Sequence, residues 1–258
     1  MDSKTGDNKT GNDRPTALVT GGSGGIGSRI VRHLADDGFR VVLTFNRSGG
    51  EAASQVEEYT AAGLDVDAVQ VDLADPTELA RFVAKFAEDY GKLDVLVHAA
   101  ASGVFGSLPK LVNRKYDDYL ATFAVNTHAL THLLAWCGES MSDNGRVLNI
   151  SSLNSSLGMF GSAAYAGSKA AGEAIIRAAA RELGSRGITC NTVQLGLVET
   201  ASMRNEVNQQ AVDWYALQAP AGRIGSPGDV ADLVSHLVSE RSSWMTGQTI
   251  RMDGGYHF

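Results

Sequence analysis

The stretch Thr20-Gly21-Gly22-Ser23-Gly24-Gly25-Ile26-Gly27 decides the fold of this chain. It follows a short apolar run, and a segment with helical hydrophobic periodicity begins directly after it. Glycines in such a turn let the backbone approach a pyrophosphate, whose charge the helix N-terminus stabilises. A tight turn without a ligand uses the same residues, but the order of strand, loop and helix favours a dinucleotide site. Its predicted residues are Gly21, Ser23, Gly25, Ile26 and Gly27.

The alternation of strand and helix continues along the chain. Apolar runs predict seven strands, at residues 17–20, 41–45, 66–71, 95–99, 147–150, 188–193 and 249–252. Helical periodicity predicts helices at 26–37, 51–62, 77–90, 116–140, 165–186 and 228–239. Several strand runs are continuously apolar, so we expect a mostly parallel, seven-stranded sheet covered on both faces. This pattern indicates a single doubly wound α/β domain of the Rossmann type over residues 16–258, preceded by a disordered tail at 1–15.

Composition argues against several classes of protein. The 258 residues include 22 basic and 29 acidic side chains, and the net charge of −7 opposes binding to nucleic acid or to an anionic membrane. There is no apolar stretch of the roughly 18 residues that a membrane span needs, and no secretory h-region. Cys137 and Cys190 lack the spacing of a disulfide framework or a metal site. We therefore expect a cytoplasmic protein without metal that acts on a small molecule.

The residues after the second and third predicted strands bear on the choice of dinucleotide. An NAD enzyme usually carries an acid after the second strand, to bind the ribose 2'-hydroxyl. Here Asn46, Arg47 and Ser48 stand there instead, and the Arg47 guanidinium suits the 2'-phosphate of NADP(H). A solvated loop arginine is the alternative. After the third strand, Asp72 and Leu73 can approach the adenine, although Asp72 can equally cap the helix that follows.

A tyrosine, a lysine and a serine form a candidate catalytic group. Tyr165 and Lys169 stand four residues apart on a predicted helix, which puts the phenol and the ammonium on one face. A neighbouring cation stabilises phenolate, so we expect this tyrosine to exchange a proton with an alcohol or a carbonyl. Ser152 ends the fifth strand at the carboxyl edge of the sheet, where its hydroxyl can bind the substrate oxygen.

With these motifs, the chain resembles the short-chain dehydrogenase/reductase family over residues 16–255. The resemblance implies that Tyr165 is the general acid, that Ser152 positions the carbonyl and that Lys169 also binds the nicotinamide ribose. It implies that Asn126 holds a water in the proton relay and that Thr200 contacts the nicotinamide carboxamide. Further cofactor contacts are implied at Ala99, Ala100, Gly196 and Val198.

The chain departs from the family pattern at two strand ends. His98-Ala99-Ala100-Ala101 replaces the usual Asn-Asn-Ala-Gly, and Leu195-Gly196 replaces the usual Pro-Gly. His98 is interpreted as a buried core histidine in preference to a catalytic one. His128 and His132, four apart on a helix, fit a subunit contact or a solvated face better than a metal site.

The chain resembles two groups of enzymes within this family. Ala100 to Gly103 resembles the NADPH-dependent enoyl-carrier-protein reductases of short-chain type, and the general plan resembles the ketoacyl-carrier-protein reductases. The enoyl reductases separate their Tyr and Lys by six residues, which would need a Tyr at Ser162. The spacing from Tyr165 to Lys169 therefore favours reduction of a ketone.

We predict an NADP(H)-dependent ketoreductase. An enoyl reductase and a non-catalytic dinucleotide-binding regulatory protein are the alternatives. Residues 197–222 are interpreted as a substrate lid, in which Trp214, Tyr215 and Leu217 suit an apolar substrate unless they serve ordinary surface contacts. Leu157, Met159 and Phe160 carry the same two interpretations. The substrate is then an apolar or cyclic carbonyl compound, or an acyl chain on a carrier protein. Helices 116–140 and 165–186 are expected to form a homotetramer, or at least a dimer.

Overall fold

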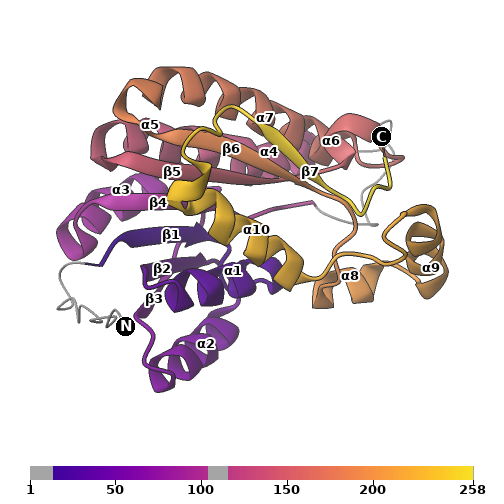
Figure 1. The fold of residues 1–258 in the computed structure, drawn as a ribbon, viewed down its shortest axis with the longest axis horizontal. Helices are drawn as coiled ribbons and strands as arrows, with labels where there is room; N and C mark the ends of the chain where they lie inside the picture. Colours follow the sequence, from indigo (N-terminus) through magenta and orange to yellow (C-terminus); the bar gives the residue numbers. More distant parts are fainter. Residues whose placement is uncertain (1–13, 104–115, 258) are drawn as a thin grey trace, which may run out of the picture.

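The computed structural model describes residues 14–103 and 116–257, whose strands form one seven-stranded sheet (Figure 1). The strand order is β3-β2-β1-β4-β5-β6-β7, and every neighbouring pair is parallel. The strands are β1 (Thr16–Thr20), β2 (Arg40–Phe45), β3 (Val66–Gln70), β4 (Leu93–His98), β5 (Met141–Ser152), β6 (Thr189–Leu195) and β7 (Thr249–Met252). The predicted doubly wound α/β fold is confirmed, and no antiparallel strand joins this sheet in the described ranges.

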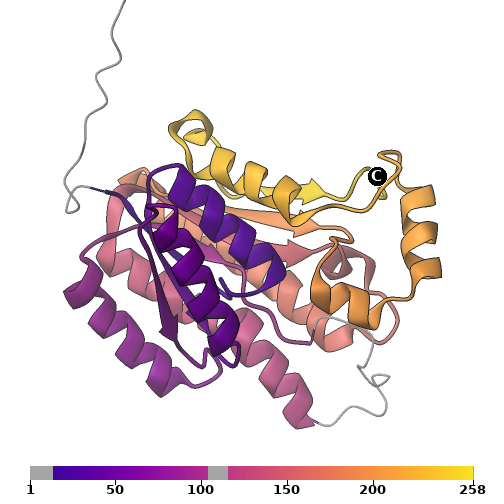
Figure 2. The ribbon, with the colours of Figure 1, turned by 90° about the horizontal axis from the view of Figure 1, so that it is seen from below.

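Helices cover both faces of the sheet (Figures 1 and 2). One face carries α1 (Gly25–Asp36), α2 (Gly49–Ala61) and α10 (Pro227–Val238). The other carries α3 (Pro76–Tyr90), α5 (Ala129–Ser140) and α7 (Ala163–Leu183). The remaining helices are α4 (Tyr116–Phe123), α6 (Asn154–Leu157), α8 (Ala201–Glu206) and α9 (Gln209–Gln218), with the π-helix η2 (Ala124–His128) and the 3₁₀ turns η3 (Gly184–Arg186) and η4 (Glu240–Ser242).

The continuously apolar strands fill two separate cores, one on each face. In β4, Leu96 belongs to the core under α3, α5 and α7, whereas Val95 and Val97 belong to the core under α1, α2 and α10. Side chains alternate between the faces of a strand, so a strand covered on both faces needs apolar residues at every position. This explains the unbroken apolar runs in the sequence.

The helix predicted over 116–140 is interrupted by the π-helix η2. Its central residue, Asn126, is buried, and its side chain forms three hydrogen bonds with groups outside this helix. A single π turn adds one residue to a helix, and such turns often occur at functional sites. Hydrophobic periodicity does not reveal this interruption, because the contacts that accompany it are tertiary.

The segments beyond the carboxyl edge of the sheet are the least regular part of the fold. Figure 1 shows α6, α8, α9 and the C-terminal residues on that side of the molecule. Helices α8 and α9 lie within the stretch that we interpret as a substrate lid.

At the other end of the chain, residues 1–13 of the predicted tail lie outside the described residues. The Pro15 carbonyl, in the described part, accepts the Arg40 N–H at 3.0 Å. Among the described residues, no helix has the length and hydrophobicity needed to cross a membrane.

Candidate active site

The parallel sheet brings most of the predicted site residues to one edge. The turns after β1, β2, β3, β4 and β6 all lie at the carboxyl edge, together with the end of β5. Those turns and that strand end hold Gly21, Ser23, Gly25, Ile26, Gly27, Asn46, Arg47, Ser48, Asp72, Leu73, Ala99, Ala100, Ser152, Gly196, Val198 and Thr200. Asn126 lies in η2, and Tyr165 and Lys169 lie in the first two turns of α7.

The glycine loop has little room for a side chain at Gly21, Gly25 or Gly27. Gly21 has a φ of +67°, and a Cβ there would lie 2.7 Å from the Ala100 Cα. A Cβ on Gly27 would lie 2.2 Å from the Gly21 carbonyl oxygen, and one on Gly25 would lie 3.1 Å from the Thr200 Cβ. The loop is thus folded tightly against the turns after β4 and β6, as a backbone that wraps a pyrophosphate must be.

The N-terminus of α1 offers backbone donors for that pyrophosphate. Its N-cap is Gly24, no side chain caps it, and its first turn carries no acid. The first N–H groups of a helix lack partners within the helix, and they stabilise an anion by hydrogen bonding and through the helix dipole. The chemistry of these donors fits a dinucleotide.

The loop after β2 lies next to the glycine loop. The Ser23 and Ser48 hydroxyls are 2.8 Å apart, and the Gln55 side chain donates to the Ser23 carbonyl at 3.2 Å. Arg47 is exposed and forms no ion pair with any described residue. Its position leaves the guanidinium available to an anion beside the loop.

The turn after β3 excludes one of the two interpretations of Asp72. Asp75, not Asp72, is the N-cap of α3, because its carboxylate accepts the N–H groups of Thr77 and Glu78. The Asp72 carboxylate instead accepts the Ala74 N–H at 2.9 Å, within the turn. Asp72 therefore does not cap the helix.

His98 ends β4 as a buried, neutral side chain. Burial lowers the pKa of His98 to about 3, with a further contribution from the charge of Lys169. Its Nδ1 lies 2.9 Å from the Thr20 hydroxyl, which also accepts the Ala100 N–H at 3.3 Å. Thr20 and His98 thus join the ends of β1 and β4 and support the altered segment after β4. The interpretation of His98 as a core histidine agrees with this environment.

Asn126 holds η2, α7 and the segment after β4 together. Its Oδ1 accepts the Ser102 N–H at 2.8 Å, and its Nδ2 donates to the Ser102 carbonyl at 3.0 Å. The same Nδ2 donates to the Ser168 hydroxyl at 2.9 Å, and that hydroxyl donates to the Tyr165 carbonyl. The side chain of Asn126 is therefore fixed between the element that carries Tyr165 and the turn after β4.

Ser152, Tyr165 and Lys169 meet where β5 ends against α7. Ser152 is half-buried, whereas Tyr165 and Lys169 are both buried. The Ser152 hydroxyl accepts the Asn154 N–H at 3.3 Å and lines the same cavity as the Tyr165 phenol. The Lys169 Nζ lies 5.8 Å from the centroid of the Tyr165 ring and donates to the Ile150 carbonyl at 2.8 Å. The three predicted catalytic residues are therefore neighbours in space.

Burial dominates the electrostatics of this group. It raises the pKa of Tyr165 to about 12, and the neighbouring Ser152 hydroxyl only partly opposes the rise. Burial also lowers the pKa of Lys169 to about 8, and Glu173 opposes that fall. The sequence led us to expect a phenol acidified by Lys169. The structure gives the opposite direction, because loss of solvent outweighs an ammonium that is directed at a backbone carbonyl.

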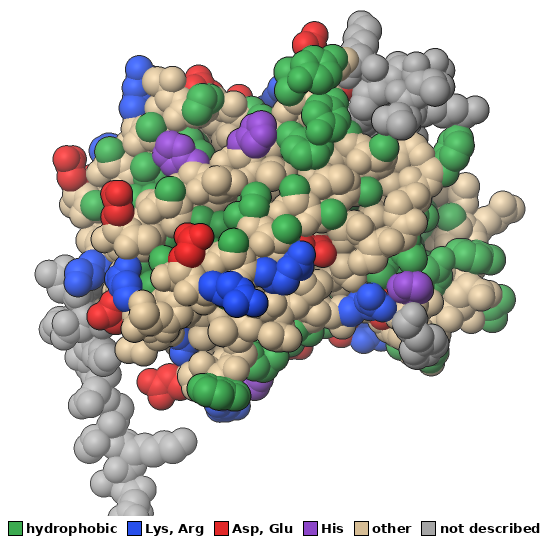
Figure 3. Space-filling view, turned by 90° about the horizontal axis from the view of Figure 1, so that it is seen from above, with side chains coloured by type: hydrophobic (Ala, Val, Ile, Leu, Met, Phe, Trp, Pro, Cys, Tyr) green, Lys and Arg blue, Asp and Glu red, His purple; other side chains and the backbone are tan. Residues whose placement is uncertain are grey.

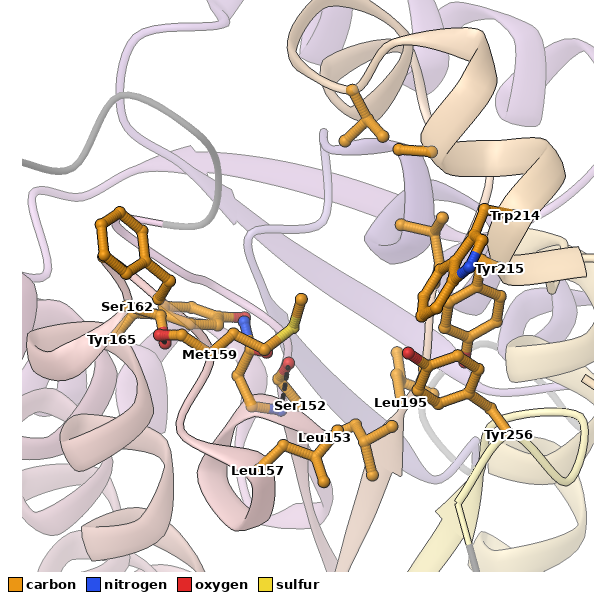
Figure 4. Close-up of a pocket in the computed structure, with 17 residues that line it drawn as sticks. Ser152, Leu153, Leu157, Met159, Ser162, Tyr165, Leu195, Trp214, Tyr215 and Tyr256 are labelled. Atoms are coloured by element: carbon orange, nitrogen blue, oxygen red, sulfur yellow. Dashed lines mark hydrogen bonds between the residues drawn. The ribbon is translucent and has the colours of Figure 1, made fainter. Parts of the chain in front are cut away.

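A cavity of about 280 Å³ opens beside these hydroxyls (Figure 4). In Figure 4, Ser152 and Tyr165 lie on one side, and Trp214, Tyr215 and Tyr256 lie on the other. None of the described residues that line the cavity is charged. The lining residues are Ser152, Leu153, Asn154, Leu157, Met159, Phe160, Gly161, Ser162, Tyr165, Leu195, Gly196, Leu197, Val207, Ala211, Trp214, Tyr215 and Tyr256.

The cavity includes some predicted pocket residues and excludes another. Met159, Phe160 and Trp214 line it, but Leu217 does not and is 81% exposed. Sequence reasoning missed Tyr256, whose ring stacks on Tyr215 at 4.2 Å between centroids. Its place near the C-terminus carries no motif, and only the return of the chain after β7 brings it to the cavity.

The segment after β6 reaches both the glycine loop and the cavity. The Thr200 hydroxyl accepts the Met203 N–H at 3.1 Å as the N-cap of α8, and Thr200 lies against Gly25. The Tyr215 hydroxyl lies 2.0 Å from the position that a Cβ on Gly196 would take. The Tyr215 side chain could move away, but a Cβ on residue 196 would also lie 2.8 Å from the Asp253 Cα, and this backbone contact favours glycine even without the proline that the family usually has before it.

The described residues contain no cluster of three or more His, Cys, Asp or Glu side chains that could hold a metal ion.

Comparison with known proteins identifies the family. Residues 21–257 match a family model described as Enoyl-(Acyl carrier protein) reductase. The chain is 33% identical over 244 residues to the 3-oxoacyl-[acyl-carrier-protein] reductase FabG of Staphylococcus aureus, which covers 94% of this chain and 98% of that protein. The chain belongs to the short-chain dehydrogenase/reductase family. The predicted family and oxidoreductase class are thereby confirmed.

Two further short-chain dehydrogenase/reductase relatives extend this likeness. The acetoacetyl-CoA reductase of Cupriavidus necator is 33% identical over 245 residues, which make up 93% of this chain and 97% of that protein. The structure of a short chain dehydrogenase from Burkholderia cenocepacia in complex with NADP is 33% identical, with a TM-score of 0.86. That comparison covers 94% of this chain and 97% of the other.

The glycine loop leads to a first prediction. Gly27→Ala should weaken NADPH binding by about tenfold or more, because the new methyl group would meet the Gly21 carbonyl and displace the loop. Gly24→Ala is the matched control, since a Cβ there would lie at 3.4 Å from the same oxygen, an ordinary contact. Fluorescence titration with NADPH measures both, and thermal unfolding checks that both fold. Equal affinity of the two variants would contradict this account of the loop.

Proposed function

We propose that this protein is an NADP(H)-dependent ketoreductase, which transfers a hydride between the nicotinamide and the carbon of a ketone or secondary alcohol. The observation that carries the proposal is the group formed by Ser152, Tyr165 and Lys169 at the mouth of an uncharged cavity. Its relatives include two reductases of 3-oxoacyl compounds and a structure with NADP. The cofactor is NADP(H), which supplies or accepts the hydride when bound.

Tyr165 acts as the general acid in the reduction. With a pKa of about 12, its phenol is protonated at neutral pH and can donate its proton to the carbonyl oxygen. Ser152 and Tyr165 line the same cavity, so a substrate oxygen bound between the two hydroxyls receives a hydrogen bond from each. The charge of Lys169 stabilises the phenolate that the transfer leaves behind.

The cofactor is held by the carboxyl edge of the sheet. The glycine loop and the start of α1 bind the pyrophosphate, and Arg47, with Asn46 and Ser48, binds the 2'-phosphate. Asp72 and Leu73 lie by the adenine. The nicotinamide side is held by Ala99, Ala100, Gly196, Val198 and Thr200, and by Lys169 at the ribose. Asn126 would hold a water of the proton relay.

The cavity suits an apolar or cyclic carbonyl substrate. Its described walls carry no charge, and Trp214 and Tyr256 meet edge to face at 6.0 Å on the side opposite the catalytic hydroxyls. Aromatic walls favour flat or bulky apolar groups by contact area. Residues 197–222 act as the substrate lid over this cavity. An acyl chain delivered by a carrier protein is the other substrate that this lining accepts.

An enoyl reductase is the second candidate, because the matched family model carries that description. The separation of Tyr165 from Lys169 and the presence of Ser152 favour proton delivery to the carbonyl that also receives the hydride. A regulatory protein without turnover is the third candidate. It would have no use for two hydroxyls that meet at a substrate-sized cavity.

A cyclic enone with NADPH tests the proposal. We expect the allylic alcohol as product, identified by NMR, and Tyr165→Phe should lower its rate of formation by roughly 10²- to 10⁴-fold because the general acid is lost. NADPH binding by the variant should stay close to that of the unmodified protein. A saturated ketone would establish the enoyl reductase instead. Tight NADPH binding without turnover of enones or ketones would favour the regulatory protein.

Arg47 should determine the choice of cofactor. A charge-assisted hydrogen bond to phosphate contributes about 1.5 to 3 kcal/mol, which corresponds to about 10- to 150-fold in affinity. Arg47→Asp should therefore remove most of the preference for NADPH, measured as the ratio of kcat/KM with NADPH to that with NADH. Arg29→Asp, which changes an exposed arginine on α1, is the control for net charge. An unmodified protein with equal efficiency for both cofactors would refute the role of Arg47.

We also propose that the protein forms a homotetramer and acts in the cytoplasm. Figure 3 views the side of the molecule formed by α5 and α7, where hydrophobic side chains are scattered between charged ones. On α7, Ala174 and Ala178 are exposed, whereas Ala179 is buried within the protomer. Small exposed residues let two helices approach closely. Both cysteines are free and buried, as suits a reducing compartment.

Light scattering at micromolar concentration tests the assembly. We expect the mass of a tetramer for the unmodified protein and a smaller mass for Ala174→Arg, since the long charged side chain would separate the two helices. Ala53→Arg, at an exposed position of α2 on the opposite side of the sheet, should leave the mass unchanged. A monomeric mass for the unmodified protein would rule the assembly out.

A further inference from the structure

A buried carboxylate lies one helical turn beyond Lys169. Glu173 is 8% exposed, and its Oε1 accepts three hydrogen bonds. The donors are the Ser151 hydroxyl at 2.6 Å, the Ser155 hydroxyl at 2.5 Å and the Gln194 side-chain amide at 3.1 Å. Burying a charge is costly unless it is paired and hydrogen-bonded, so these donors stabilise the carboxylate where it lies.

The three donors belong to the elements that surround Ser152. Ser151 precedes it in β5, and the single proton of the Ser155 hydroxyl in α6 is shared between Glu173 and the Ser152 carbonyl, which lies 2.7 Å away. Gln194 lies in β6, where its amide donates to the Ser155 hydroxyl as well. Through a single oxygen, Glu173 thus joins α7 to both sides of the strand end that presents Ser152.

The same carboxylate acts on Lys169 through charge. Glu173 opposes the effect of burial and raises the pKa of Lys169. The other titratable groups around this lysine are Tyr165 on α7 and His98 on β4, and His98 is neutral at any physiological pH. Arg251 on β7 faces the network only through Gln194, to whose Oε1 it donates at 3.2 Å. Glu173 is therefore the anion that acts on the Lys169 ammonium.

We propose that Glu173 is a positioning residue, which keeps Lys169 charged and holds Ser152 in place for the proton transfer. The inference rests on the proposed roles of Ser152, Tyr165 and Lys169. Glu173 itself touches neither substrate nor cofactor. Its contribution is to maintain the ammonium in a buried site, where burial alone would favour the neutral amine.

The pH dependence of ketone reduction by the holoenzyme tests the charge. Above the pKa of Lys169, about 8, the ammonium is lost and kcat should fall. Glu173→Gln keeps an acceptor oxygen but removes the charge, so Lys169 should lose its proton at a lower pH. The alkaline limb of the pH profile of kcat should move down by about one pH unit. At pH values between the limb of the variant and that of the unmodified protein, kcat of the variant should be up to about tenfold lower. The KM for NADPH should change little.

Two variants complete the experiment. Glu182→Gln removes an exposed acid from the same helix and should leave the limb in place. Glu173→Asp keeps the charge but shortens the side chain, so its limb should stay near that of the unmodified protein while kcat falls at every pH. Thermal unfolding reports any structural damage, which lowers stability without moving the limb.

The outcomes separate this inference from the proposed function. If Glu173→Gln folds and its alkaline limb does not move, the role of the charge is overturned. If Glu173→Gln does not fold, the test passes to Glu173→Asp. An unchanged kcat or a shifted limb in Glu173→Asp then overturns the inference. Either result leaves the ketoreductase intact as long as Tyr165→Phe is inactive. An active Tyr165→Phe would instead overturn the function on which the inference rests.

Discussion

Polar and glycine residues from six separate strand ends meet in this protein because all seven strands of the sheet run in the same direction. A parallel sheet places every carboxyl end at one edge, and the chain returns across a face after each strand. The glycine loop after β1, Arg47 after β2 and Ser152 at the end of β5 therefore share one edge although they are far apart in sequence. The cofactor site and the catalytic group depend on this constraint.

Burial sets the chemistry at that edge. The first turns of α7 face the sheet, so Tyr165 and Lys169 lose their solvent and both are driven toward their neutral forms. A neutral phenol suits proton donation, but a neutral amine would not stabilise the phenolate that results. The carboxylate of Glu173, which accepts hydrogen bonds from three donors, opposes the lowering of the Lys169 pKa by burial and has no such effect on Tyr165. One helix thus carries an acid that burial keeps protonated and a cation that a buried anion maintains.

The cavity beside this group is lined by apolar and uncharged polar side chains. No described wall residue is charged, and the side opposite Ser152 is built from Trp214, Tyr215 and Tyr256. The Tyr215 hydroxyl fills the space above Gly196 and donates to the Asp253 carbonyl at 3.2 Å. Tyr215 thereby ties α9, within the stretch that we propose as a substrate lid, to the segments that follow β6 and β7.

The sequence by itself determined the strand and helix order, the glycine loop and the group of Ser152, Tyr165 and Lys169. These features are local, because a strand needs continuous apolar residues, a phosphate turn needs glycine, and an i, i+4 pair shares a helix face. Only the tertiary structure decided the π turn at Asn126, the place of Tyr256 in the cavity and the direction of the Tyr165 pKa. All three features depend on contacts between residues far apart in the chain and on the solvent that those contacts exclude. A single sequence displays no periodicity or motif for such contacts or for the burial that they cause.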